Sequence, residues 1–449
     1  MIDAGAKPSD IVAFFAPDAA AFVDARKEYL LYPQENCAAA ASLPAAGRPG
    51  GETIMHGDAA ARAADEINYF SAYGVLQHQK QMLEDDSRMS AYYEAVMTNA
   101  HVFKDKVVMD VGTGSGVLAL WAAKAGAKKV YAVEYTSMAN HAKRLVEANG
   151  YGDVVTVIQS SAEEVELPDG AEKVDIIISE WMGYVTVCAD CVATVRCRLL
   201  LLLAPAPLTH RSPFRYFLLR ESMLDSVLHA RDRFLKPDGV MFPSRATMRV
   251  ALVSQKGSRD HVVREFEHTV AGFSDFRDKT LDLYDIDLAA IEDAYASEQR
   301  GYYLKTSTWD LLDERHVVTD DAVVKLLDLK TCSREEALGV DPVAFELEAL
   351  ESLKGPTQAT ALVGWFDVEF DDGTQDGPVV VLGTGPADLP THWGHQVFYL
   401  NEAFRVQAGD TVAGALDMHR SEANQRLYRV GVELSLGDER WPRSVYAMP

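Results

Sequence analysis

Residues 107–125 constrain the fold more than any other segment. Residues 107–111 are the apolar run of a buried strand, 112–116 form a glycine-rich turn, and 117–125 have the alanine and leucine spacing of a helix. Further strands are expected at 130–134, 154–158 and 174–179, with a second helix at 138–148. Strands that alternate with helices through short connections predict a parallel sheet covered on both faces, with a ligand site at the carboxyl ends of its strands.

The glycine-rich turn also predicts the kind of cofactor. Glycines let the backbone approach a ligand closely at the N-terminus of a helix. Gly112, Gly114 and Gly116 follow Asp110 with a tighter spacing than the dinucleotide fingerprint, and this spacing is typical of S-adenosylmethionine-dependent methyltransferases. Glu134 ends the next strand, where an acidic residue accepts the ribose hydroxyls. A nicotinamide-dependent dehydrogenase is the competing hypothesis, although no catalytic set for it is visible.

The residue pattern divides the rest of the chain into domains. Residues 1–64 are an N-terminal extension and linker, and helices are expected within 68–98, so we assign a methyltransferase domain to 65–245. After residue 245 the alternating runs 247–253, 362–370 and 379–382 predict an antiparallel β-barrel domain over 246–449. Residues 272–312 are acidic and aromatic with helical spacing, and we expect a helical excursion from the barrel there.

The composition limits which partners the protein is expected to bind and where in the cell it is expected to lie. The net charge of −24 argues against direct nucleic-acid binding and favours basic partners, although acidity also simply promotes solubility. Five sparse cysteines do not resemble a disulfide framework, and the N-terminus shows no secretory signal. The longest apolar run, 199–204, is too short to span a membrane. We therefore expect no membrane association and a cytoplasmic or nuclear location.

Specific motifs add a family resemblance. The sequence Ile-Ile-Ile-Ser-Glu-Trp-Met-Gly-Tyr at 176–184 resembles the first half of the double-glutamate loop of protein arginine methyltransferases, and Leu-Arg-Glu-Ser-Met-Leu at 219–224 resembles the second half. The aromatic residues at 69–73, followed by 81–88, resemble the helix that folds over the cofactor. Pro-Thr-His-Trp at 390–393 resembles the threonine–histidine–tryptophan loop. The matches cover roughly 66–400 and are most similar to the plant branch of the family, its tenth type.

The resemblance implies a Rossmann-like methyltransferase domain followed by an antiparallel β-barrel, with 272–312 as a helical dimerisation arm that makes a homodimer. It implies S-adenosylmethionine as cofactor and type I chemistry, giving mono- and asymmetric dimethylarginine. It also implies basic, Arg/Gly-rich proteins and histones as substrates. The residues that match the family's site are Glu180, Glu221 and His392 for catalysis, Tyr69, Phe70, Met82, Arg88, Asp110, Gly112, Gly114, Glu134 and Glu163 for the cofactor, and Tyr73 and Trp393 for the substrate.

Two glutamates suit the chemistry of arginine. A guanidinium ion is planar and permanently charged, so two opposed carboxylates can hold it by charge-assisted hydrogen bonds and turn one nitrogen toward a methyl donor. Arg88 would pair with the carboxylate of the cofactor's methionine moiety, and Glu163 would lie on the adenine side. His392 would orient its loop or assist proton release. Room beside Tyr73 and Met82 is what the resemblance links to a second methyl group.

The chain departs from the family pattern between the two glutamates. Glu180 and Glu221 lie 41 positions apart, and without residues 185–216 they would lie nine apart, as in the family's loop. The extra segment is a translated intron or gene-model error, a genuine protruding loop, or a zinc site made by Cys188, Cys191, Cys197 and His210. We expect no metal. Because such a loop would splay the glutamates, the competing hypothesis is a catalytically impaired, cofactor-binding scaffold or a mis-spliced form.

Overall fold

The computed structural model describes residues 74–182, 217–219, 222–374, 377–421, 424 and 426–448, apart from the Asp169 side chain. All of them belong to one compact unit of the chain, residues 56–449. Predictions for the N-terminal extension, the 185–216 segment, Tyr69, Phe70, Tyr73 and Glu221 lie outside the described residues. Among the described residues, no helix is both long and apolar enough to cross a membrane.

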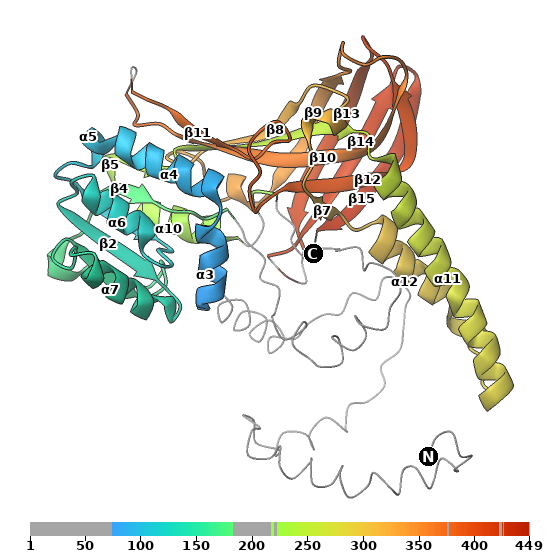
Figure 1. The fold of residues 1–449 in the computed structure, drawn as a ribbon, viewed down its shortest axis with the longest axis horizontal. Helices are drawn as coiled ribbons and strands as arrows, with labels where there is room; N and C mark the ends of the chain where they lie inside the picture. The colour runs from blue at the N-terminus through green and yellow to red at the C-terminus, as the bar shows by residue number, and fades with distance from the viewer. Residues whose placement is uncertain are drawn as a thin grey trace, which may run out of the picture. The chain divides into compact units, whose positions relative to one another are not determined.

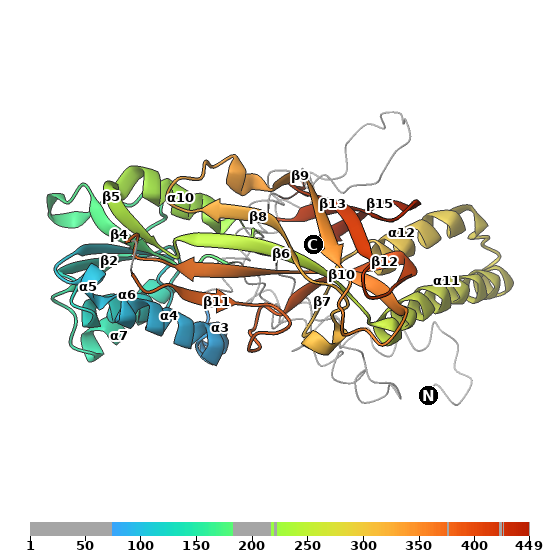
Figure 2. The same ribbon diagram turned by 90° about the horizontal axis from the view of Figure 1, so that it is seen from above.

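A five-stranded parallel sheet with the strand order β3-β2-β1-β4-β5 forms the first part of the fold. Figure 2 shows α6 and α7 on one face of this sheet and α10 on the other, as right-handed crossovers require when the strand order reverses beside β1. The described elements of this part are α3 (Leu76–Leu83), α4 (Asp86–Thr98), α5 (Ala100–Phe103), β1 (Val107–Val111), α6 (Val117–Lys124), β2 (Lys129–Glu134), α7 (Met138–Ala148), β3 (Val155–Gln159), β4 (Val174–Ile178), α10 (Met223–Phe234) and β5 (Leu235–Phe242).

Two antiparallel sheets follow and make the β-barrel part. One has the order β7-β12-β10-β6-β8, with β11 also paired to β10, and the other has the order β15-β14-β13-β9. An isolated antiparallel bridge joins Thr319, which precedes β8 of the first sheet, to Ala349, which follows β9 of the second. The strands are β6 (Arg245–Val253), β7 (Thr308–Asp310), β8 (Ala322–Asp328), β9 (Val340–Glu348), β10 (Thr357–Phe370), β11 (Val380–Gly383), β12 (His395–Val406), β13 (Thr411–Arg420), β14 (Tyr428–Leu436) and β15 (Glu439–Met448). The predicted architecture, a Rossmann-like domain followed by an antiparallel barrel, is confirmed.

A helical hairpin interrupts the barrel strands between β6 and β7. It consists of α11 (Lys256–Tyr284) and α12 (Glu292–Leu304), joined through a 3₁₀ turn, and both views show it projecting from the strands (Figures 1 and 2). The two helices pack through the stacked rings of Phe273 and Tyr295, whose centroids are 4.4 Å apart. The hairpin begins 16 residues earlier than the expected 272–312, and β7 lies inside that range.

One hydrophobic core extends from the parallel sheet into the barrel strands. The ring of Tyr92 on α4 meets that of Phe370 on β10 edge-on at 4.8 Å, and Phe103 meets Phe242 at 5.2 Å. All four rings are almost fully buried. Each such ring stabilises the fold by roughly 1.5–3 kcal/mol, so the carboxyl ends of the parallel strands are held against the barrel.

Candidate active site

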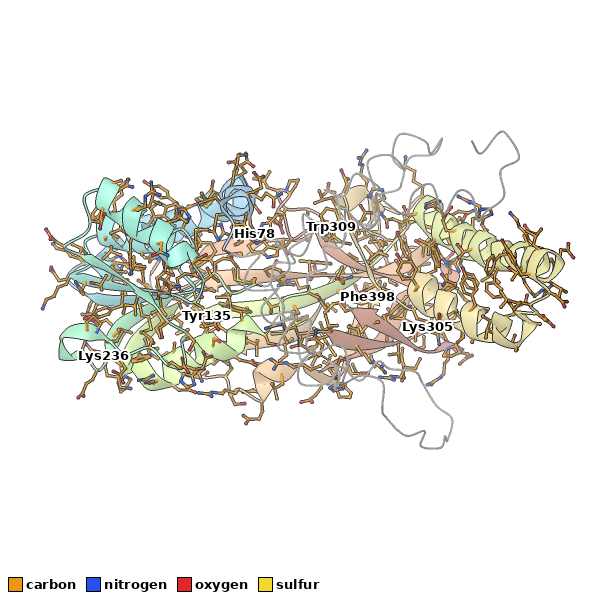
Figure 3. The ribbon with its side chains drawn as sticks, turned by 90° about the horizontal axis from the view of Figure 1, so that it is seen from below. His78, Tyr135, Lys236, Lys305, Trp309 and Phe398 are labelled. Carbon is orange, nitrogen blue, oxygen red and sulfur yellow. The ribbon has the colours of Figure 1, made fainter. Side chains whose placement is uncertain are left out.

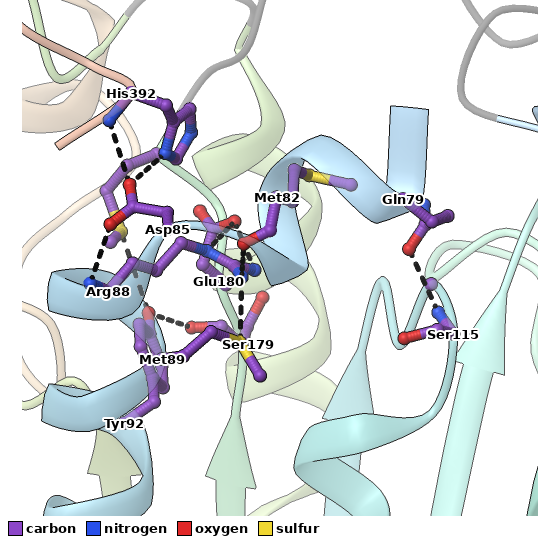
Figure 4. A network of polar contacts seen from close by, with 12 residues as sticks. Gln79, Met82, Asp85, Arg88, Met89, Tyr92, Ser115, Ser179, Glu180 and His392 are labelled. Atoms are coloured by element: carbon purple, nitrogen blue, oxygen red, sulfur yellow. Dashed lines mark hydrogen bonds and ion pairs between the residues drawn. The ribbon is translucent and has the colours of Figure 1, made fainter. Parts of the chain in front are cut away.

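Asp85, which caps α4, joins this helix to the loop before β12. Its Oδ1 accepts the Arg88 backbone N–H at 3.0 Å. Its Oδ2 accepts the His392 backbone N–H at 2.8 Å and lies 2.5 Å from Nδ1 of that imidazole. Burial opposes ionisation of Asp85, but hydrogen bonds from His392 and Arg88 outweigh it, so the pKa of Asp85 lies below its ordinary value. One carboxylate thus fixes both the start of α4 and the His392 ring (Figure 4).

Arg88 and Glu180 form a nearly buried ion pair. Arg88 donates from Nε at 3.1 Å and from Nη2 at 2.9 Å to the same oxygen, Glu180 Oε2. Its Nη1 donates to the Met82 carbonyl at 3.0 Å. The other oxygen, Glu180 Oε1, is buried, and no described residue donates to it. Oε2 of Glu180 is therefore occupied by Arg88, and Oε1 can accept a hydrogen bond from a ligand (Figure 4).

The backbone on both sides of Glu180 is fixed. Ser179 follows β4 and donates from Oγ to the Val111 carbonyl at 2.6 Å, while its own carbonyl accepts the Tyr92 hydroxyl at 3.1 Å. On the other side, the Met182 carbonyl accepts the Trp393 indole N–H at 3.1 Å. Contacts from β1, α4 and the loop before β12 therefore hold Glu180 in place at the end of β4.

Trp393 supports the site from within the core. Its side chain is fully buried and meets the ring of Phe366 edge-on, at a centroid distance of 5.4 Å. Its carbonyl accepts the indole N–H of Trp309 at 2.6 Å. Trp309, on β7, is labelled in Figure 3. Trp393 contacts the site through the Met182 carbonyl and through the His392 ring, whose centroid lies 4.1 Å from its own. Its contact with substrate stays a prediction.

The glycine-rich turn joins β1 to α6 as predicted. Gly112 and Gly114 have φ angles of +73° and +55°, which L side chains rarely adopt. A Cβ at Gly112 would lie 2.2 Å from the Met223 side-chain methyl, and one at Gly114 would lie 2.9 Å from Gln79 Oε1. That same Gln79 oxygen accepts the Ser115 N–H at 3.2 Å (Figure 4). The turn is therefore a bare backbone surface bordered by α3 and α10.

Glu134, at the end of β2, binds the turn directly. Its Oε2 accepts the Gly114 N–H at 2.9 Å, and its Oε1 accepts both the N–H and the hydroxyl of Thr136, at 2.8 and 2.7 Å. A carboxylate offers about four acceptor positions. Since three are occupied, a ribose diol that binds both oxygens must displace at least one of these donors.

Asp110 is buried beneath the same turn. Its Oδ2 accepts the Thr113 hydroxyl at 2.5 Å, and its Oδ1 has no donor among the described residues. Burial raises the pKa of Asp110 to about 7, against hydrogen bonds from the Thr113 side chain and the Ala119 backbone that lower it, and the nearby Glu134 charge adds to the rise. Asp110 therefore titrates near neutral pH, which its position near the end of a buried strand did not reveal.

The remaining predicted residues lie around these two groups. Met82 is buried beneath Arg88. Glu163 is exposed, and its Oε1 accepts the Ser226 hydroxyl on α10 at 2.7 Å. The structure thus brings Met82, Arg88, Glu180 and His392 together in one cluster, and Asp110, Gly112, Gly114 and Glu134 in another. Gln79 on α3 contacts the second cluster and lies one helical turn from Met82.

Sequence reasoning missed three residues of the site. Asp85 carries an N-cap signal, an acidic residue at the start of a helix, but its contact with His392 spans 307 positions. Gln79 gave no signal, because its role depends on the turn it touches. His78 is buried, and burial followed by the His392 charge lowers its pKa to about 4, so it is neutral at pH 7.

Comparison with known families agrees with this geometry. Residues 245–439 match the family model described as the arginine methyltransferase oligomerization subdomain. Residues 91–187 match the model described as ribosomal protein L11 methyltransferase. The first match covers the barrel strands from β6 to β14 and the helical hairpin, and the second covers the glycine-rich turn and Glu180.

Individual relatives extend over most of the chain. Protein arginine N-methyltransferase PRMT10 of Oryza sativa subsp. japonica is 41% identical over 401 residues, covering 87% of this chain and 92% of that protein. PRMT10 of Arabidopsis thaliana is 39% identical over 390 residues, covering 86% and 90%. A crystal structure of Arabidopsis thaliana protein arginine methyltransferase 10, titled as a uniquely open conformation, has a TM-score of 0.73 and 37% identity, covering 85% of this chain and all of that one.

Proposed function

The chain belongs to the protein arginine N-methyltransferase family, and we propose that the cluster around Glu180 binds the substrate guanidinium. As a member, it is an S-adenosylmethionine-dependent enzyme that methylates arginine side chains of proteins. The proposal concerns which of its residues carry the reaction and which products it forms.

Glu180 Oε1 is the observation that carries this assignment. A buried carboxylate oxygen without a donor costs free energy, and a catalytic or binding role is one reason why native proteins keep such an atom. A guanidinium N–H would supply the missing hydrogen bond with charge assistance. Arg88 already holds Oε2, so Glu180 is oriented before the substrate arrives. Glu221 would supply the opposing carboxylate, as the family motif implies.

Asp85 and His392 are placed to receive the proton that arginine loses. The ionised Asp85 carboxylate holds Nδ1 of His392, which leaves proton exchange to Nε2. The same carboxylate also holds the His392 backbone N–H and caps α4 through its other oxygen, so the ring and the backbone of His392 are both tied to the start of this helix. We assign His392 as the proton acceptor and Asp85 as the residue that orients it.

The second cluster fits S-adenosylmethionine. Gly112 and Gly114 present bare backbone, Glu134 has an acceptor at the end of β2, and Asp110 has a buried oxygen without a donor among the described residues. Glu163, exposed beside α10, fits the adenine side. Tyr69 and Phe70 would cover the cofactor, as the motif implies. When bound, S-adenosylmethionine supplies an electrophilic methyl group on its sulfonium sulfur.

The family resemblance supports type I products, mono- and asymmetric dimethylarginine, with Tyr73 and Met82 beside the guanidinium. The net charge of −24 supports basic substrates, which we propose to be Arg/Gly-rich proteins and histones in the cytoplasm or nucleus.

The helical hairpin supports a homodimer. Leu283, Tyr284 and Ile286 at the turn of the hairpin are 59%, 69% and 53% exposed, which is unusual for large apolar side chains that are close together. A second copy of the chain would bury them. Replacing Leu283 and Ile286 together by glutamate should yield a monomer in light scattering, and an unchanged mass would refute this contact.

Methyl transfer to an Arg/Gly-rich peptide tests the role of Glu180. With methyl-labelled S-adenosylmethionine, Glu180→Gln should lose on the order of 10²–10³-fold in kcat, as when an oriented charge is removed from a reaction centre. Cofactor affinity should persist. Glu164→Gln, on an exposed side chain beside Glu163, is the matched control and should keep wild-type turnover. Wild-type turnover by the Glu180 variant would refute the assignment.

The 185–216 segment separates the enzyme from the scaffold hypothesis. A variant without this segment should be assayed beside the full chain. If both transfer methyl groups, the segment is a tolerated loop. If both bind the cofactor and neither transfers, the scaffold hypothesis replaces the proposed function.

A further inference from the structure

The first turn of α10 touches both parts of the cofactor site. The Met223 methyl packs on the backbone of Gly112, where it lies 2.2 Å from the position of an added Cβ. Three residues later, the Ser226 hydroxyl donates to Glu163 at 2.7 Å. The position of this turn therefore determines how closely α10 borders the glycine-rich turn and where the Glu163 carboxylate lies.

The N-cap of this turn makes no side-chain capping hydrogen bond to it. This residue, Ser222, has φ +62°, which non-glycine residues rarely adopt. A residue in this conformation persists only when the surrounding structure imposes it. The anchor must therefore come from outside α10.

Arg420, at the end of β13, supplies that anchor. It donates from Nη1 and Nη2 to the two oxygens of Asp225 on α10, both at 2.7 Å, and from Nε to the Tyr428 hydroxyl at 3.0 Å. Tyr428 also hydrogen-bonds Ser222. The Arg420 side chain is 11% exposed and that of Asp225 is 38% exposed, so water reaches the pair from the Asp225 side only. A forked guanidinium on one carboxylate fixes direction as well as distance.

We propose that Arg420 is a positioning residue, which holds the first turn of α10 against the cofactor site through Asp225 and so sets the affinity for S-adenosylmethionine. The inference rests on the proposed function, because it takes Gly112 and Glu163 as cofactor residues. Through this contact, the barrel strands set the geometry of a site built from the parallel sheet.

The test measures the Kd of S-adenosylmethionine by calorimetry for Arg420→Met, Asp225→Asn and the double variant. We expect Arg420→Met to weaken binding about tenfold, as for residues that act on a ligand site through another residue. The double variant should bind no more weakly than Arg420→Met, because both changes break one contact. Arg443→Met is the control: Arg443 pairs with both oxygens of Asp417 on β13, at 2.6 and 2.8 Å, without touching α10. The Kd of Arg443→Met for S-adenosylmethionine should stay within about twofold of the wild-type value.

Hydrogen exchange in the ligand-free protein gives a readout independent of binding. The amides of 223–227 should exchange faster in Arg420→Met and keep their wild-type rate in Arg443→Met. If Arg420→Met does not fold, the Kd and the hydrogen exchange are both measured on Asp225→Asn instead. Wild-type affinity in the Arg420 and Asp225 variants, or equal weakening in the Arg443 control, overturns the inference. If the wild type itself does not bind S-adenosylmethionine, the proposed function fails instead, and unchanged exchange at 223–227 would still overturn the role of Arg420.

Discussion

Replacing Arg88 by methionine should destabilise the protein strongly, whatever its effect on activity. Arg88 donates two hydrogen bonds to Glu180 Oε2, and the two side chains are only 11% and 10% exposed. Without Arg88, the Glu180 carboxylate would have no donor among the described residues. Removing one partner of a buried pair costs about 3–5 kcal/mol. Losing the hydrogen bond to the Met82 carbonyl adds about 1 kcal/mol. We therefore expect the free energy of unfolding to fall by about 4–6 kcal/mol.

Urea unfolding measures this loss directly. Adding Glu180→Gln to Arg88→Met should recover part of the stability, because a neutral amide is cheaper to bury than an unpaired carboxylate. Lys80→Met removes the exposed ion pair of Lys80 with Glu84 on α3 and should change stability by less than about 1 kcal/mol. A loss below about 1 kcal/mol in Arg88→Met, or no recovery in the double variant, would refute the reasoning.

Three further predictions follow from the same contacts. Because the pKa of Asp110 is raised to about 7, its protonated form stabilises the fold fully below about pH 4, and this contribution is lost as the pH rises through 7. Between pH 4 and 7, the free energy of unfolding of Asp110→Asn should therefore rise by up to about 4 kcal/mol relative to that of the wild type, as measured by urea titrations at several pH values. A difference between the two proteins that does not change with pH would contradict the raised pKa. Asp85→Asn removes the charge that orients His392 and should lower kcat about 10²-fold with unchanged cofactor affinity; an unchanged kcat would exclude this role. Trp309→Phe keeps the ring but leaves the Trp393 carbonyl without its donor, so calorimetry should show a lower Tm corresponding to about 1–3 kcal/mol, and an equal Tm would show that this bond is dispensable.

The α/β part was predictable because its signals are local. The expected strand 107–111 and helix 138–148 match β1 and α7 to the residue, and the helix after the glycine-rich turn ends one residue earlier than predicted. In these segments, a buried apolar run or an amphipathic stripe is bounded by glycine or a polar turn, so period and length agree.

The helical hairpin was only partly predictable. Its first helix starts at Lys256, whereas the helical spacing was recognised only from 272. Of its 29 residues, only Val262 and Phe273 are buried, so no continuous apolar stripe marks its first four turns. A helix that projects from the strands gives a weak periodic signal, because most of its surface meets water.

The candidate site was also only partly predictable from the sequence. Motif spacing was sufficient to name Arg88, Glu180 and His392 as site residues. It could not pair Arg88 with Glu180 or join His392 to Asp85, because these contacts connect residues 92 and 307 positions apart. It also placed Trp393 at the substrate, which stays a prediction. Sequence therefore proposed the side chains, and only the fold showed their partners.

The most direct measurement is the identity of the product. This chain should be incubated with S-adenosylmethionine and an Arg/Gly-rich peptide, and the methylated residue should be identified by fragmentation mass spectrometry. We expect arginine that carries one methyl group, followed by arginine that carries two on the same nitrogen. Recovery of unmodified arginine, under conditions in which calorimetry shows the cofactor bound, would contradict the assignment of this chain as an active arginine methyltransferase.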